Sequence, residues 1–132
     1  MAEHGTIRIP DEEYKQRVQR AAKILQREGL DALIVNSNEA DYANARYFSG
    51  FWPLFERCGV AISPAGDAAL MVGPESREFG ADRCKLDKVF VLKAYREGAD
   101  PAYPELQADT YQDEFNALGI KGKKLRIGVA SY

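Results

Sequence analysis

One short segment holds most of the side chains in this sequence that could contact a ligand or a partner. Residues 47–57 read Tyr-Phe-Ser-Gly-Phe-Trp-Pro-Leu-Phe-Glu-Arg, so five aromatic rings and an arginine lie close together along the chain. Aromatic rings beside arginine are typical of interface hot spots and of the rims of ligand pockets. Core packing is the alternative, and we expect it for Tyr47 and Phe48. The residues predicted to form an exposed contact surface are Phe51, Trp52, Phe55 and Arg57.

The residue types that metal binding and nucleophilic catalysis need are scarce. His4 is the only histidine, and it lies in a polar N-terminal tail. The rest of the chain therefore has no imidazole for a Ser-His-Asp triad or for a histidine-based metal site. Cys58 and Cys84 show no metal-binding or redox spacing, so we expect two reduced thiols. We predict that this chain has no catalytic residue and binds no metal or other cofactor.

Carboxylates could act without histidine. Glu75, Glu78 and Asp82 would share one face of a predicted helix. No turn beside them supplies further oxygen ligands for a cation, and arginines are adjacent, so a solvated helix face explains them better. An enzyme that acts through carboxylates such as Glu75 and Asp82 is the weaker alternative.

Charge and hydropathy argue against two classes of partner. Eighteen basic and twenty acidic residues give a net charge of −2, whereas nucleic-acid-binding domains normally carry a basic surplus. No stretch approaches the roughly 18 apolar residues that can span a bilayer, and the N-terminus lacks the layout of a secretory signal. We expect a cytoplasmic protein that binds neither nucleic acid nor membrane. A basic cluster without interleaved aromatic rings is expected to be a solvated turn: Lys121, Lys123, Lys124 and Arg126.

Hydrophobic periodicity predicts the elements that must position the aromatic segment. Apolar residues from Tyr14 to Leu25 form one stripe of an amphipathic helix, which Gly29 is expected to end. Short apolar runs predict strands, and residues 64–67 join two of them in a hairpin. Residues 93–110 lack a clear period and are expected to form a surface excursion. The predicted helices cover residues 11–28, 39–46, 74–84 and 111–118, and the predicted strands cover residues 30–35, 58–63, 68–72, 89–92 and 125–129.

Helices that alternate with short strands, together with one hairpin, predict an α/β layered domain around a mixed sheet of five or six strands. The chain has 132 residues, 45% of them apolar, which fits a single domain with a tail over residues 1–9. It stops three residues beyond the last predicted strand, where such domains usually continue with a covering helix. We therefore expect it to be part of a longer protein.

The order of the motifs adds a family resemblance. A helix with Glu13-Tyr14 and Arg17 is followed by Gly29-Leu30-Asp31-Ala32-Leu33 and then by Tyr47-Phe48-Ser49-Gly50-Phe51. This order resembles the N-terminal domain of the creatinase, prolidase and aminopeptidase P family over about residues 11–129. Phe48 and Ser49 take the places of a common Leu and Thr, and Ala45 replaces an Asn that usually precedes the tyrosine by two residues.

The resemblance implies a two-domain enzyme whose N-terminal domain is ribonuclease H-like and not itself catalytic. A C-terminal "pita-bread" domain, absent from this chain, would carry two Asp, one His and two Glu that hold two divalent metal ions, Mn, Co or Zn. Metal-activated water would attack the bond before proline. Creatinase-type members use the same scaffold without metal.

The resemblance also implies a homo-oligomer, commonly a dimer or tetramer, in which the N-terminal domain leans over a neighbouring subunit's active site. In the creatinase branch a Phe-x-Arg motif reaches the substrate there, and Phe55-Glu56-Arg57 is similar in type and place, one residue nearer to Phe51. Arg57 would suit a substrate carboxylate through paired hydrogen bonds. We therefore expect the non-catalytic N-terminal domain of an Xaa-Pro peptidase, which supports oligomerisation and shapes a neighbour's substrate pocket. The alternatives are the N-terminal domain of a metal-independent creatinase-like amidinohydrolase and a stand-alone ligand-binding module.

Overall fold

The computed structural model of the chain describes residues 7–97 and 107–131, where helices and strands alternate as the sequence predicts. The helices are α1 (Asp11–Glu28), α2 (Ala43–Ser49), α3 (Arg77–Arg83) and α4 (Tyr111–Ala117), with 3₁₀ turns η1 (Pro74–Ser76) and η2 (Lys93–Tyr95). The strands are β1 (Ala32–Ser37), β2 (Cys58–Ile62), β3 (Ala68–Val72), β4 (Lys88–Val91) and β5 (Ile127–Ala130). The predicted α/β class is confirmed.

The five strands form one mixed sheet in the order β4-β3-β2-β1-β5. The β1–β2 and β2–β3 pairs are antiparallel, whereas the β3–β4 and β1–β5 pairs are parallel. Val35 in β1 is therefore paired with Val60 on one side and with Ala130 on the other. Strands β1, β3, β4 and β5 all end on the same side of the sheet, where β2 begins. This side is called here the carboxyl edge.

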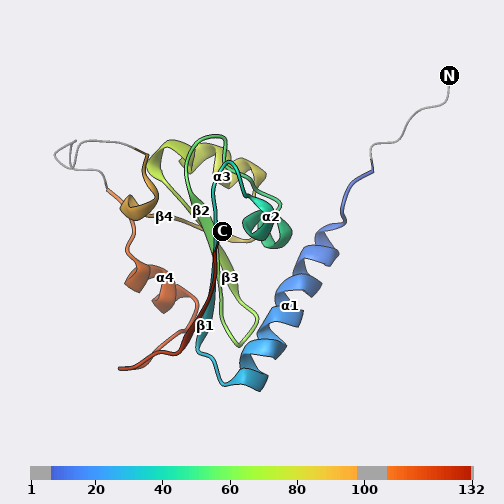
Figure 1. Cartoon of the computed structure of the whole chain (residues 1–132), viewed down its shortest axis with the longest axis vertical. Coiled ribbons are helices and arrows are strands. Elements are labelled where there is room, and N and C mark those ends of the chain that lie inside the picture. Colours follow the sequence, from blue (N-terminus) through green and yellow to red (C-terminus); the bar gives the residue numbers. More distant parts are fainter. Residues whose placement is uncertain (1–6, 98–106, 132) are drawn as a thin grey trace.

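Helices cover both faces of the sheet, with α1, α2 and α3 on one face and α4 on the other (Figure 1). Side chains alternate between the faces along each strand because successive Cβ atoms point to opposite sides. Val60 and Ile62 of β2 join the core under α1, whereas Ala61 between them joins the core under α4.

Helix α1 has the predicted bounds because its apolar stripe and its end signal are both local. Val18, Ala21 and Leu25 are buried against the sheet. Gly29 has a φ of 63°, which glycine adopts without steric cost, and it turns the chain into β1. The predicted hairpin between β2 and β3 is also confirmed, closed by the Ser63 N–H that donates to the Asp67 carbonyl at 2.8 Å.

Helix α2 lies further along the chain than the predicted helix over residues 39–46. The Asn38 side chain is the cause, because its Oδ1 accepts hydrogen bonds from the amides of Ala40 and Asp41 at 2.9 and 2.7 Å. That local turn replaces the first helical hydrogen bonds. The helix begins only at Ala43 and ends at Gly50, whose φ is 73°.

Several other boundaries also differ from the predicted ones. Strand β1 includes two polar residues at its end because the fold gives both a partner: Ser37 Oγ accepts from the Ala45 amide, and Asn36 Oδ1 accepts from the Tyr95 hydroxyl. The predicted helix over 74–84 is divided into η1 and α3, and β5 begins two residues later than predicted. Of the predicted surface excursion, residues 98–106 lie outside the described residues, and Tyr95 is buried.

Candidate functional site

The chain bends at residues 54–56 and then enters β2, and neighbouring side chains at this end of the aromatic segment differ in burial. Phe55 is 45% exposed and Arg57 is also exposed, whereas Glu56 between them is buried and Cys58 after them begins β2 inside the core. Phe55 and Arg57 line the same hollow, next to the start of β2 at the carboxyl edge of the sheet. Trp52, in the middle of the aromatic segment, is 38% exposed. Three of the four predicted contact residues thus lie at the surface.

Phe51 is the exception, and the prediction that it contributes to an exposed surface is wrong. Its side chain is fully buried, with its ring centroid 5.4 Å from that of Phe79 on α3 in an edge-to-face arrangement. The turn at Gly50 sends Phe51 inward, and the Ser49 hydroxyl fixes that turn by accepting from the Phe51 amide at 3.1 Å. Tyr47, expected in the core, is 44% exposed, so that prediction is also wrong, while Phe48 packs against the core as expected.

Trp52 belongs to a stack of aromatic and cationic groups that the sequence did not single out. The Arg46 guanidinium lies 4.5 Å from the Trp52 ring and 5.8 Å from the ring of Tyr42. Tyr42 is 38% exposed, so it extends the same surface. Tyr42 and Arg46 stand four residues apart at the start of α2, a spacing that brings side chains together on a helix and could have revealed the pair. Exposed rings held by a cation are suited to contact a planar or apolar partner group.

A hollow of about 260 Å³ lies beside Phe55 and Arg57. It contains two guanidinium groups, from Arg57 and Arg96, and guanidinium groups bind carboxylates and phosphates through paired hydrogen bonds. It also contains carboxylates, so a ligand with both charges would be complementary to it. Its lining consists of Asn38, Glu39, Phe55, Glu56, Arg57, Arg96 and Glu97.

Two buried carboxyl groups were also missed, because charged residues are rarely buried. Glu56 is 1% exposed, and burial first, with the adjoining Glu75 carboxyl second, raises its pKa to about 7. Glu114 on α4 is fully buried, and burial first, with the charge of Asp109 second, raises its pKa to about 8. No pattern in the sequence separates these two carboxyls from exposed ones.

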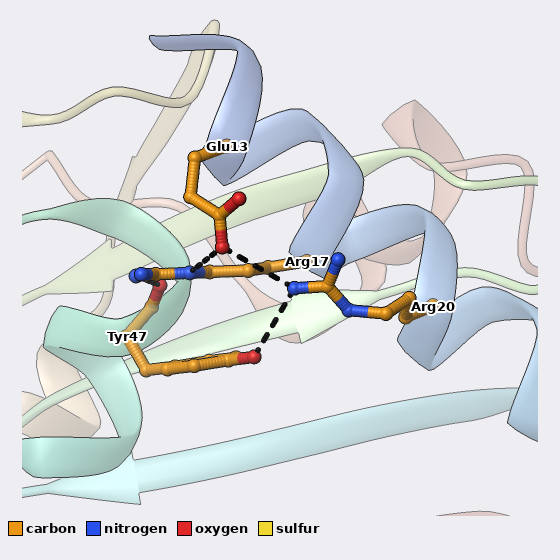
Figure 2. A network of polar contacts seen from close by, with 4 residues as sticks. All are labelled: Glu13, Arg17, Arg20 and Tyr47. Carbon is orange, nitrogen blue, oxygen red and sulfur yellow. Dashed lines mark hydrogen bonds and ion pairs between the residues drawn. The ribbon is translucent and has the colours of Figure 1, made fainter. Parts of the chain in front are cut away.

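Arg17 on α1 and Tyr47 on α2 join the two helices beside the aromatic segment (Figure 2). The Arg17 guanidinium lies 4.4 Å from the Tyr47 ring centroid, and its Nη1 donates to the Tyr47 carbonyl at 2.9 Å. Its Nε donates to Glu13 Oε1 at 3.0 Å, and this hydrogen bond is the main cause that lowers the pKa of Glu13. Arg20 reaches Glu13 at 3.4 Å and the Tyr47 hydroxyl at 3.5 Å. One face of the Tyr47 ring thus packs on Arg17 at the surface of the domain, which leaves Tyr47 partly exposed.

We predict that Arg17→Ala lowers the free energy of unfolding by about 1–2 kcal/mol, because two partly exposed charge-assisted hydrogen bonds and the cation–π contact with Tyr47 are lost together. Urea unfolding followed by circular dichroism measures the change. Arg20→Ala is the matched comparison, since Arg20 is more exposed and its contacts with Glu13 and Tyr47 are longer, at 3.4 and 3.5 Å, so its unfolding midpoint should fall by less. Equal midpoints for both variants would contradict a role of Arg17 in holding α2 on α1.

The other candidate residues do not form a site in the described part of the chain. Glu75, Glu78 and Asp82 are exposed, as a solvated helix face requires. Both cysteines are free, and burial raises the pKa of Cys58 to about 12 and that of Cys84 to about 11. Among residues 7–97 and 107–131, no group of three or more His, Cys, Asp and Glu side chains is placed to hold a metal ion. No helix in those same ranges is both long and apolar enough to cross a membrane.

Comparisons with known proteins agree with this fold. The structure is similar to the creatinase/prolidase-like N-terminal domain of a Corynebacterium diphtheriae protein, with 15% sequence identity, a TM-score of 0.56 and coverage of 90% of this chain and 97% of that one. It is also similar to an X-Pro aminopeptidase from Thermotoga maritima (20% identity, TM-score 0.54, 86% of this chain and 26% of that one). A prolidase from Pyrococcus horikoshii gives 15% identity, a TM-score of 0.53, and coverage of 86% of this chain and 32% of that one.

The chain thus spans about a quarter to a third of the length of those two enzymes. A comparison with curated proteins finds no match. The model of the Creatinase/Prolidase N-terminal domain family matches residues 17–132, which is most of the sequence and includes the whole aromatic segment. The chain therefore belongs to the creatinase/prolidase N-terminal domain family.

Proposed function

We propose that this chain is the non-catalytic N-terminal domain of an Xaa-Pro peptidase, and that it shapes the substrate pocket of a neighbouring subunit in a homo-oligomer. The observation that carries the proposal is the exposed surface of Trp52, Phe55 and Arg57 at the carboxyl edge of the sheet. Rings and a guanidinium left exposed together have the composition of a contact surface and lie outside the core of the domain. The family of the chain supports the same reading.

Arg57 has a specific task in this proposal. A dipeptide that ends in proline has a planar carboxylate, and a guanidinium binds such a group through two parallel hydrogen bonds. The hollow beside Arg57 is large enough for a carboxylate and part of a ring, with Phe55 on its wall. Trp52 and Phe55 would cover the apolar part of the substrate, which also shields the pocket from bulk solvent.

The metal ions that the family resemblance implies do not fit the residues of this chain. The described residues offer no cluster of carboxylates and imidazole for a binuclear centre, as stated above. We therefore propose that Mn, Co or Zn ions bind to a C-terminal pita-bread domain of the same cytoplasmic protein. The bond-breaking step then takes place on that domain, and the residues described here bind, orient and cover the substrate.

Two substitutions in the protein encoded by the complete gene test the proposal. We predict that Arg57→Ala and Trp52→Ala each lower kcat/KM for an Xaa-Pro dipeptide by about tenfold or more. Arg57→Ala removes a charge-assisted contact worth ~1.5–3 kcal/mol, and Trp52→Ala removes apolar contact area of similar worth, about 1.5–3 kcal/mol. Arg27→Ala is the matched control, because Arg27 is an exposed arginine at the end of α1, before β1 begins. Values within twofold of the unchanged protein for both variants would contradict the proposal.

A mixing experiment tests the neighbouring-subunit role. Subunits with Arg57→Ala are combined with subunits whose catalytic domain has been inactivated, and the oligomer is reassembled. If Arg57 acts across the interface, some mixed oligomers pair an intact Arg57 with an intact catalytic domain, so activity returns. No return of activity would mean that Arg57 acts within its own subunit or not at all. Turnover of a guanidino acid such as creatine, in place of an Xaa-Pro dipeptide, would favour the amidinohydrolase alternative.

A further inference from the structure

Glu56 lies between the exposed residues Phe55 and Arg57 in the sequence, but its side chain points into the domain. The bend over residues 54–56 leaves Phe55 and Arg57 outside and turns the Glu56 side chain inside, where it is 1% exposed. A side chain held inside constrains its two neighbours, because a movement that exposes Glu56 must also turn the backbone that carries them. The position of Phe55 and Arg57 therefore depends on how firmly the Glu56 carboxyl is held.

The carboxyl of Glu56 is held below the turn that follows β3. Its Oε1 accepts a hydrogen bond from the Glu75 amide at 3.4 Å, at the start of η1. Gly73 makes room for it, because a Cβ at that position would lie 2.6 Å from the Glu56 Cδ and 2.6 Å from the Tyr95 carbonyl oxygen. The second oxygen, Oε2, is buried and has no hydrogen-bond partner in the described residues. A buried charge without a full set of partners is costly, so this position favours the uncharged carboxyl.

The surrounding groups act in both directions. Burial raises the pKa of Glu56 most and the Glu75 carboxyl raises it further, whereas the Ser76 side chain and the Glu75 amide lower it, which leaves a pKa of about 7. Burial raises the pKa of the Cys58 thiol on β2, and the charge of Glu56 raises it further. The remaining charged groups near it line the adjoining hollow and are Glu39, Arg57, Arg96 and Glu97.

We propose that Glu56 is the positioning residue of the contact surface: its uncharged carboxyl locks residues 52–57 under the turn at Gly73, and loss of its proton loosens them. The role of this lock in substrate binding rests on the proposed function above, but the movement itself does not. The unfolded carboxyl has a pKa near 4.5 and the folded one a pKa of about 7, so the folded chain holds the proton more tightly. The lock is therefore complete below about pH 4.5 and is lost as the pH rises through 7.

Trp52 reports on this segment, because it is the only tryptophan in the chain. We predict that quenching of its fluorescence by acrylamide rises with pH, with a midpoint near pH 7. Glu56→Gln keeps the shape of the side chain without its charge, so quenching should stay at the low-pH value from pH 5 to pH 9. Glu56→Ala removes the anchor and should give the high value at every pH. Glu75→Gln removes the neighbouring carboxyl and should move the midpoint to lower pH.

The buried carboxyl of Glu114 titrates in a neighbouring range and provides the control. Glu114→Gln should keep the transition of the unchanged chain, and circular dichroism should show the same helix content throughout. A transition that persists in Glu56→Gln would overturn the proposal. Because the readout needs no turnover, that result leaves the proposed peptidase role untouched. Conversely, a failure of Arg57→Ala to change kcat/KM would leave the fluorescence result standing.

Discussion

Replacing Phe51 with alanine should lower the free energy of unfolding by about 3–5 kcal/mol, the loss typical of a buried phenylalanine truncated to a methyl group. The ring is fully buried between α2 and α3 and contacts Phe79 edge to face. Its removal leaves a cavity that the sheet cannot fill, because the strands below it are held by hydrogen bonds on both sides.

Urea unfolding at a fixed pH measures this loss. Phe55→Ala is the matched control, since it removes the same side chain four residues later from a position that is 45% exposed. It should change the free energy of unfolding by no more than about 0.5–1 kcal/mol. Similar losses for the two variants would mean that the turn at Gly50 does not direct Phe51 into the core as described.

The second large effect is a loss of stability as the pH rises, and it comes mainly from Glu114. Its two carboxyl oxygens are buried and have no hydrogen-bond partner in the described residues. The folded pKa is about 8, against 4.5 for the unfolded carboxyl, so the folded chain binds the proton more tightly. The resulting stability is complete below pH 4.5 and is lost as the pH rises to about 8. The slope is about 1.4 kcal/mol per pH unit for one proton.

Glu114→Gln removes the titration while keeping the size of the side chain. We predict that the stability of this variant relative to the unchanged chain rises by about 3–4 kcal/mol between pH 5 and pH 8. Urea unfolding at both pH values provides the comparison, and Glu78→Gln, at an exposed position on α3, is the control that should show no such rise. A parallel pH dependence of the Glu114 variant and the unchanged chain would show that the buried carboxyl is ionised at neutral pH.

Local signals explain which parts of the fold could be predicted. Helix α1 and the β2–β3 hairpin are specified by periodicity and turn residues within the elements themselves, and their predicted bounds agree closely with the structure. The end of β1 could not be predicted, because the partners of Asn36 and Ser37 are Tyr95 and Ala45, which are distant in sequence or belong to another element. From the sequence alone, polar residues at this point indicate that the strand has ended, because their hydrogen-bond partners are known only from the folded structure.

The exposure of Trp52, Phe55 and Arg57 could be predicted from the sequence, whereas the burial of Phe51 could not. Helix α2 ends at Ser49, three residues beyond the predicted end. Tyr47 therefore lies on the helix with its ring exposed, and Phe51 follows the turn at Gly50 into the core. Glu56 could not be recognised, because its burial depends on the space at Gly73, seventeen residues away. Residue type alone places a glutamate at the surface.

The parallel pairing of β1 with β5 has a consequence for the timing of synthesis. About 90 residues separate the end of β1 from the start of β5, so one side of β1 has no strand beside it until β5 has been synthesised. At roughly 5–20 residues per second this interval lasts about 5–20 seconds. An unpaired strand edge with apolar side chains can add a strand from another nascent chain during that time. Slow translation between residues 38 and 126 should therefore increase aggregation of this protein, and faster elongation over the same stretch should reduce it.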